Sequence, residues 1–166
     1  MKNSDAKMKV ATINELKQEL SALPNVELVE LCLRLAKFKK ESKELLTYLL
    51  FESHSPDGYI ASVKEYISLE FDGMAVTHLY HAKKTLRKIL RITNKHIRFT
   101  GSKQAEIELL LYFCEKMRRS GVRVENSVQL TNLYNQQLRK VEKALETLHE
   151  DLQYDYRRQL DKLSFV

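Results

Sequence analysis

Two histidines three positions apart are the first residues whose spacing could bind a metal ion. His78 and His81 would share one face of a helix, and Asp72 precedes them closely in the sequence. A closed zinc site needs four ligands, however, and a pair of histidines at this spacing arises easily by chance. His78 and His81 are therefore weak metal candidates, and the sequence favours ordinary surface histidines. We expect no cofactor.

Glutamates recur at a helical spacing near the C-terminus. Glu146 and His149 form a Glu-x-x-His motif, but a di-iron bundle needs two such motifs on different helices, and the sequence has one. Glu142, Glu146 and Glu150 are each four residues apart, which places them along one side of a helix. This spacing is typical of a solvated face, since an acid/base pair needs carboxylates whose surroundings shift their pKa values apart.

Both cysteines lie among apolar residues. Cys114 is in the segment LLLYFCEKM and Cys32 is in LVELCLRLA, and neither has the C-x-x-C spacing of a metal or redox site. Cys114 could act as a nucleophile with His96 or His81 as a distant base. Desolvation would keep such a thiol protonated and unreactive, so we expect two buried, reduced cysteines. The four glycines are isolated, which argues against a phosphate-binding loop.

One segment carries the whole positive charge of the protein. The 166 residues include 28 Lys and Arg and 22 Asp and Glu, for a formal net charge of +6. Residues 73–105 contain eight Lys or Arg and no carboxylate, so the other residues, 20 basic and 22 acidic, have a net charge of −2. Such a concentration of charge is the one conspicuous feature of the sequence, and it makes this segment the candidate surface for an acidic partner.

On a helix, the cations of this segment fall on one side. At 100° per residue, an apolar core face gathers Leu79, Ala82, Leu86, Ile89, Leu90 and Ile97. The other side carries what we call the basic ridge, which consists of Tyr80, Lys84, Arg87, Lys88, Arg91, Lys95 and Arg98. Like charges four residues apart each cost roughly 0.2–0.5 kcal/mol. A group of opposite charge next to the ridge would therefore stabilise the helix.

Three kinds of anion could lie next to the basic ridge. The first is nucleic acid, whose phosphates bind cations with a strong dependence on salt, although the sequence has no aromatic interleaving and no known nucleic-acid-binding motif. The second is an acidic protein surface. The third is internal, in the last helix, with the carboxylates Glu142, Glu146, Glu150 and Asp151. Internal compensation or simple solvation is the favoured interpretation, and nucleic acid is a minority one.

The elements that position these residues are all predicted to be helices. Gly and Pro total six residues, and each isolated glycine is expected to end a helix in the left-handed conformation. SHSPDG is the predicted loop, with Pro56, Asp57 and Gly58 in a type I turn. The expected helices cover residues 12–22, 26–38 with Asn25 as N-cap, 44–52, 59–72, 75–98, 102–120 and 126–163. The segment KKESKE is either a turn or part of an unbroken helix, which gives six or seven helices.

Apolar residues of the last predicted helix form a heptad pattern, with Asn126 and Gln129 as a capping box. The pattern consists of Tyr134, Leu138, Val141, Leu145, Leu148 and Leu152. Over so few heptads it indicates packing within the chain more strongly than a coiled coil between two chains. A homodimer through this helix is the alternative.

Four ordered blocks, LKQELSALPNVELVELCLRLAKFKKESKELLTYLL, YHAKKTLRKI, ELLLYFCEKMRRSGV and LYNQQLRKVEKAL, span most of the chain. In their order and spacing they resemble a family of uncharacterised bacterial helical proteins of about this length, catalogued as a domain of unknown function. The FESHSPDG loop departs from the Asn-Pro turn expected there. The resemblance implies a bacterial helical protein and carries over no site residue.

The sequence as a whole predicts an all-α protein. We expect a flexible N-terminus over residues 1–11 and a single helical domain over residues 12–166, built as an irregular bundle or a short HEAT-like helical stack with a long C-terminal helix and with residues 102–120 at its centre. No signal peptide or membrane span is apparent, so a cytoplasmic location is expected. The favoured function is non-catalytic interaction through the basic ridge. The alternatives are an enzyme with a site assembled from dispersed residues, and a structural, self-associating protein.

Overall fold

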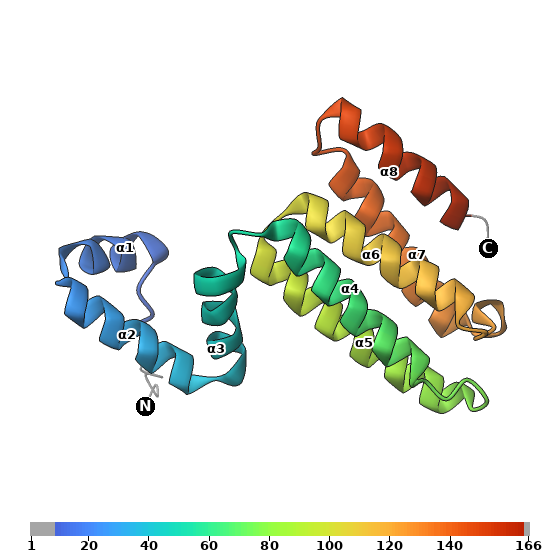
Figure 1. Cartoon of the computed structure of the whole chain (residues 1–166), viewed down its shortest axis with the longest axis horizontal. Helices are drawn as coiled ribbons and strands as arrows, with labels where there is room; N and C mark the ends of the chain where they lie inside the picture. Colours follow the sequence, from blue (N-terminus) through green and yellow to red (C-terminus); the bar gives the residue numbers. More distant parts are fainter. Residues whose placement is uncertain (1–8, 165–166) are drawn as a thin grey trace, which may run out of the picture. The chain divides into compact units, whose positions relative to one another are not determined.

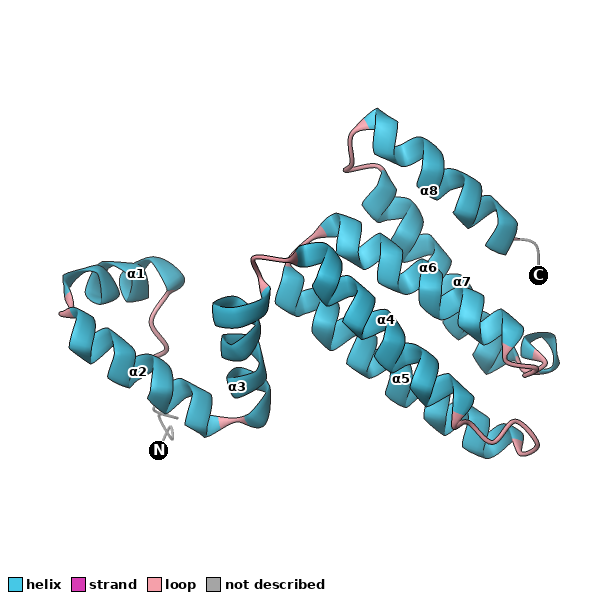
Figure 2. Ribbon diagram, in the orientation of Figure 1, coloured by secondary structure: helices cyan, strands magenta, loops and turns pink. Residues whose placement is uncertain are grey.

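The computed structural model describes residues 9–164, and all of their regular structure is helical (Figures 1 and 2). The eight α-helices are α1 (Ile13–Ala22), α2 (Asn25–Phe38), α3 (Lys40–Thr47), α4 (Pro56–Asp72), α5 (Leu79–Thr100), α6 (Lys103–Arg119), α7 (Val128–Leu145) and α8 (Glu150–Leu163). The other regular elements of the described residues are a π-helical turn, η1 (Tyr48–Glu52), and a 3₁₀ turn, η2 (Val124–Asn126). The all-α class is confirmed, and the predicted count of six or seven helices is too low.

The described residues form two compact units that meet in sequence between Thr47 and Tyr48, where the sequence predicts one domain from residue 12 onward. The N-terminal unit contains α1 to α3, and the C-terminal unit contains η1 and α4 to α8. Of the predicted flexible N-terminus, residues 1–8 lie outside the described residues.

Local capping sets the helix boundaries in the N-terminal unit. Thr12 and Glu15 form a capping box at the start of α1: the Thr12 N–H donates to the Glu15 carboxylate at 2.7 Å, and the Glu15 N–H donates to the Thr12 hydroxyl at 3.3 Å. Pro24 takes the N-cap position of α2, so Asn25 is its first helical residue and not the predicted N-cap. The segment KKESKE covers residues 39–44, and only Lys39 has an extended backbone, so the break between α2 and α3 is a single residue. The residues after Lys39 continue as α3, because Lys and Glu are good helix formers.

Helix α2 is rich in apolar residues, yet no residue of α1, α2 or α3 is buried. The prediction of a buried Cys32 is therefore wrong, because this side chain is exposed. An apolar sequence predicts a covered side chain only where another element packs over it. In α2, contacts with α3 leave most of the apolar surface open.

In the C-terminal unit, α6 is the central helix, as predicted. Eight of its side chains are buried, and it packs against α4, α5, α7 and α8 (Figure 1). Ile107, Leu110, Phe113 and Met117 are completely inaccessible to solvent. Helices α4 to α8 thus form a bundle around α6, and the alternative of a HEAT-like stack is not what the described residues adopt. Ile60, Val63 and Ile67 supply the predicted buried face of α4.

The predicted SHSPDG loop is shorter than expected. Pro56 is the first residue of α4, a position where its fixed φ fits a helix and its missing N–H costs nothing. Gly58 consequently lies inside the first turn of α4 and does not end a helix. The other glycines do follow helix ends, and Gly101 (φ +60°) and Gly121 (φ +80°) adopt the left-handed conformation that glycine favours.

The prediction of one long C-terminal helix is wrong. The chain turns at residues 146–149, and the His149 side chain caps α8 by accepting from the Asp151 N–H. Helix α8 folds back onto α6 and α7 and buries Leu160 and Leu163, and the Tyr134 hydroxyl of α7 donates to the Leu163 carbonyl at 2.9 Å. This packing outweighs the local preference for a continuous helix, since most helical stability comes from tertiary contacts.

The turn also divides the predicted heptad pattern. Tyr134, Leu138, Val141 and Leu145 of α7 are buried in the bundle, whereas Leu152 follows the turn and is exposed. The start of α7 is displaced by one residue from the predicted capping box, because Ser127 and not Asn126 accepts the Leu130 N–H.

One buried polar atom in this bundle has no partner among the described residues. The Gln137 side chain of α7 donates to the Leu133 carbonyl, but its Oε1 atom accepts no hydrogen bond and is shielded from solvent. Leaving a buried acceptor unsatisfied costs about 1–3 kcal/mol. The substitution Gln137→Met should therefore raise the free energy of unfolding by about 1 kcal/mol and the melting temperature by roughly 3 °C.

The measurement is thermal unfolding followed by circular dichroism, with Gln136→Met as the matched control. Gln136 lies next to Gln137 in α7 but is exposed, so the control should leave the melting temperature nearly unchanged. A lower melting temperature for Gln137→Met than for the control would contradict the prediction.

Candidate functional site

Helix α5 presents the basic ridge to solvent. It begins at Leu79, four residues later than predicted, and ends at the Gly101 cap. Of the six residues of the predicted core face, Ala82, Leu86 and Ile89 are completely buried on the opposite side. Leu90 and Ile97 are partly buried, and Leu79 at the start of the helix is exposed, so the predicted core face is confirmed in its middle and is wrong at Leu79. Every residue of the basic ridge is exposed except Lys95, which is partly buried. The sequence-predicted residues therefore do lie together along one face of one helix.

A single carboxylate of α4 forms an ion pair with the middle of the ridge. The Lys88 ammonium lies 2.8 Å from Glu70, and the Tyr66 hydroxyl donates to the same carboxylate at 2.8 Å. Hydrogen bonds from Lys88 and then from Tyr66 lower the pKa of Glu70. Among the described residues, no ion pair joins the ridge to the carboxylates that the sequence suggested as internal partners, namely Glu142, Glu146, Glu150 and Asp151.

At its N-terminal end the ridge borders an open groove of about 980 Å³. The groove is lined by Leu79, Tyr80, Lys83, Lys84, Thr85, Arg87, Lys88, Arg91 and Gln129. Tyr80 is 76% exposed and Leu79 is 40% exposed, and the Arg87 guanidinium reaches across to the Gln129 amide of α7 at 3.3 Å. The groove thus combines apolar contact area with five cations on its walls.

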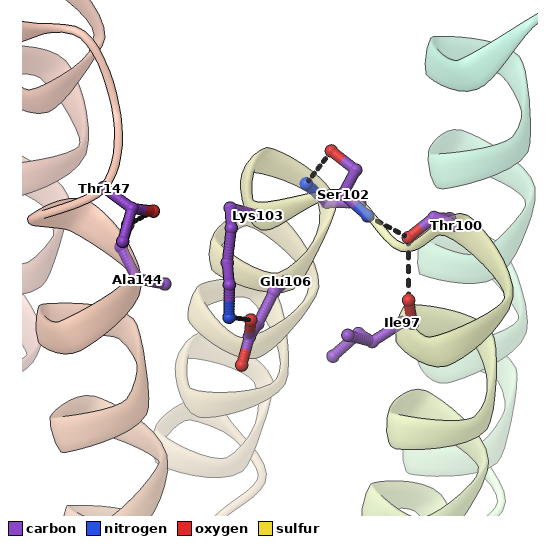
Figure 3. Close-up of polar contacts among 8 residues, drawn as sticks. Ile97, Thr100, Ser102, Lys103, Glu106, Ala144 and Thr147 are labelled. Carbon is purple, nitrogen blue, oxygen red and sulfur yellow. Dashed lines mark hydrogen bonds and ion pairs between the residues drawn. The ribbon is translucent and has the colours of Figure 1, made fainter. Parts of the chain in front are cut away.

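The cationic surface continues past the C-terminal end of α5. A second groove, of about 560 Å³, is lined there by Arg91, Asn94, Ile97, Arg98, Gly101, Ser102, Lys103, Glu106 and Lys140. Figure 3 shows the turn between α5 and α6, where the Thr100 hydroxyl donates to the Ile97 carbonyl and Ser102 caps α6. The Lys103 ammonium lies 2.7 Å from the carboxylate of Glu106, three residues further along α6, so this cation is locally paired; Figure 3 draws this ion pair.

The two histidines singled out as weak metal candidates lie at the start of α5. His78 is its N-cap residue and His81 is in its first turn, with ring centroids 6.0 Å apart in an edge-to-face arrangement. Over residues 9–164, no three His, Cys, Asp or Glu side chains are grouped closely enough to hold a metal ion. Two imidazoles alone are short of the four ligands of a closed zinc site.

Cys114 is completely buried in α6, as the sequence predicts. Burial raises the pKa of its thiol to about 12, so the thiol stays protonated at neutral pH. A protonated thiol in the packed core has neither the charge nor the access that a nucleophile needs. The interpretation of Cys114 as a catalytic nucleophile is thus not supported by its surroundings.

Sequence reasoning missed a polar cluster in a different place, where α4, α6 and α8 meet. The Glu108 carboxylate of α6 accepts from the Lys64 ammonium of α4 at 2.8 Å, from the Tyr156 hydroxyl of α8 at 2.8 Å and from the Gln104 amide at 3.2 Å. Lys64, Glu108 and Tyr156 border a groove of about 1010 Å³ between the helices. We call Glu108, Lys64, Tyr156 and Gln104 the Glu108 cluster.

The protonation states of Glu108 and Tyr156 indicate a structural role for the Glu108 cluster. We call this role a clamp, because the contacts of Glu108 join three helices. Burial alone would raise the pKa of Glu108, but the hydrogen bonds from Lys64, Tyr156 and Gln104 outweigh it and lower the pKa. Burial, and then the Glu108 carboxylate, raises the pKa of Tyr156 to about 12. At neutral pH the carboxylate is charged and the phenol is neutral, whereas a general acid or base works best with a pKa near the working pH.

The sequence contains a sign of this cluster at Glu108, but it does not indicate which residues Glu108 contacts. Glu108 stands in the run EIELLLYF, where a carboxylate surrounded by apolar residues indicates a specific polar contact. Lys64 and Tyr156 are 44 and 48 residues away from Glu108. Without the fold of α8 back onto α6, nothing in the sequence joins these three positions.

Replacing the central carboxylate tests the clamp. Glu108→Gln should lower the free energy of unfolding by about 1–3 kcal/mol, because the substitution weakens hydrogen bonds to a charged group that joins three helices. The matched control is Glu106→Gln: Glu106 lies in the same helix and is similarly accessible, but its ion pair with Lys103 is local. Urea unfolding monitored by circular dichroism measures both variants, and equal losses would contradict the clamp.

Acid should weaken the same clamp in the parent protein. Because the pKa of Glu108 is lower in the folded than in the unfolded state, its contribution is complete at neutral pH. The contribution is then lost as the pH falls below about 4.5, the ordinary value, and through the folded-state pKa. Unfolding measured over this range should show a smaller loss of stability for Glu108→Gln than for the parent, and parallel curves would argue against the assignment.

Comparisons with known protein families, with curated proteins and with solved structures find no match to this chain. The resemblance to a family of uncharacterised bacterial helical proteins therefore stays a prediction. None of the described helices combines the length and the apolar character that crossing a membrane requires. The candidate sites rest on the geometry of the chain itself, and they are the basic ridge with its grooves and the Glu108 cluster.

Proposed function

We propose that the protein binds an acidic, partly apolar segment of a partner protein along the basic ridge, without catalysis. The observation that supports this proposal is the groove beside the ridge, where exposed Leu79 and Tyr80 lie among the cations Lys83, Lys84 and Arg87. A partner with both carboxylates and apolar side chains would match both kinds of surface. Its apolar residues would supply burial and its carboxylates would supply orientation.

The electrostatics of α5 favour such a partner. Between Tyr80 and Arg98 the helix is about 27 Å long, at a rise of about 1.5 Å per residue, and it contains no carboxylate. Like charges at helical spacing repel one another. Lys88 is neutralised by Glu70, but Lys84 and Arg91 are exposed without a carboxylate among the described residues. Carboxylates of a partner would relieve this repulsion.

Nucleic acid fits the same surface less well. Tyr80 is the one aromatic residue in the basic ridge, whereas proteins that bind single strands stack successive bases on several rings. The apolar part of the groove would find no counterpart in a phosphate backbone.

The predictions of a cytoplasmic location and of an enzyme as the alternative stay untested.

Charge reversal on the ridge tests the proposal. The probe is a fluorescently labelled helical peptide of Glu and Leu heptads, and the measurement is fluorescence anisotropy with the full chain across a series of salt concentrations. Lys84→Glu with Arg91→Glu should weaken binding by about tenfold or more at low salt, because both side chains line the groove. Lys88 is left unchanged, since its replacement would break the ion pair with Glu70.

The matched control is Arg157→Glu with Arg158→Glu in α8, which changes the net charge equally at exposed positions away from α5. If both double variants weaken binding equally, the peptide responds to net charge and the proposed surface is wrong. Salt-sensitive binding of duplex or single-stranded DNA with no binding of the peptide would overturn the choice of partner.

A further inference from the structure

Helix α2 is apolar over most of its circumference. Its charged residues follow one another at intervals of three and four and form one narrow stripe, which consists of Glu27, Glu30, Arg34 and Lys37. The apolar residues occupy the remaining arc, with Cys32 near its middle, at 100° per residue. A helix that is apolar on nearly all sides is normally buried.

The structure leaves this apolar surface open. Ten large apolar side chains between residues 9 and 47 are between 38 and 86% exposed, namely Val10, Ile13, Leu16, Leu20, Val26, Val29, Leu31, Leu33, Leu35 and Phe38. Residues 48–164 expose eleven such side chains over three times that length. A concentration of this kind marks an interaction surface, because monomeric proteins rarely expose large contiguous apolar patches.

We infer that a second copy of this chain covers this surface, so that two N-terminal units pack against each other through α1 and α2. The apolar area is of the right size. Each large apolar side chain offers roughly 100 Å², so ten of them at these exposures present about 600 Å². A standard interface buries about 800 Å² per partner, of which about 65% is apolar in homodimers.

Charge also favours pairing of the N-terminal units. Residues 9–47 contain seven Lys or Arg and six Glu, for a net charge of +1, so two copies would not repel each other strongly. The positive excess of the protein lies instead in residues 73–105. A dimer formed by the N-terminal units would therefore bring together apolar surfaces of units that are nearly neutral.

The inference differs from the homodimer predicted through the C-terminal helix. Four residues of that heptad pattern, Tyr134, Leu138, Val141 and Leu145, are buried within the bundle of a single chain. They would have to leave the core to contact a second copy. The exposed residues of α1 and α2 need no such rearrangement.

Light scattering after size-exclusion chromatography measures the mass of the full chain over about a hundredfold range of concentration. The expected result is twice the chain mass at high concentration. Val29→Glu with Leu33→Lys should shift the protein to the chain mass, while its Glu and Lys at positions i and i+4 preserve the helix. The matched control, Glu30→Gln with Arg34→Gln on the charged stripe, should remain a dimer.

Alkylation of Cys32 in the parent protein provides a readout that does not depend on any variant. Cys114 is completely buried, so Cys32 is the reactive thiol of the native chain. Iodoacetamide should modify Cys32 more slowly as the concentration rises and the dimer fraction grows.

Three results would overturn the inference: a parent that has the chain mass at every concentration, a dimer that the α2 variant leaves intact, or a control that dissociates equally. Protection of Cys32 that is independent of concentration would also overturn it, because another part of the same chain would then cover α2. If circular dichroism shows that the α2 variant is unfolded, the alkylation rates of the parent decide the question.

Discussion

Helix α6 has to be covered on nearly every side, and this requirement organises the C-terminal unit. Its eight buried side chains include Ile107, Leu110 and Phe113, and one neighbouring helix can shield only a stripe of such a surface. Helices α4, α5, α7 and α8 each supply part of the cover. The turn at residues 146–149 follows from the same requirement, because a straight C-terminal helix would leave one side of α6 exposed.

The cover of α6 also determines where polar groups lie. Helix α5 buries one face against the bundle, and its cations consequently occupy the face that remains in water. Glu70 neutralises Lys88 at the middle of the ridge, and Glu108 joins Lys64 to Tyr156 on another side of the bundle. The C-terminal unit thus uses carboxylates to connect helices, whereas Lys84 and Arg91 have no such connection among the described residues.

Periodicity within one segment was a good guide to the fold. It located the middle of the core face of α5, the buried side of α4 and the central position of α6, because each depends on neighbours three or four residues apart. The sequence analysis failed where the outcome depends on distant residues. The break before α8 is stabilised by contacts of Tyr134, Leu160 and Leu163, and Cys32 is exposed because the packing of α2 against α3 leaves this side chain uncovered. The Glu108 cluster joins three helices and was missed for the same reason.

The exposed apolar surface of α1 and α2 and the basic ridge of α5 belong to separate units of the chain, and this separation has a consequence for avidity. If two copies associate through α1 and α2, each pair presents two basic ridges joined through a single assembly. An acidic partner with two binding segments would then meet its second ridge at a high effective concentration, and the gain in apparent affinity would need no new contact. Association between chains would in this way tune how strongly a repetitive acidic partner is retained.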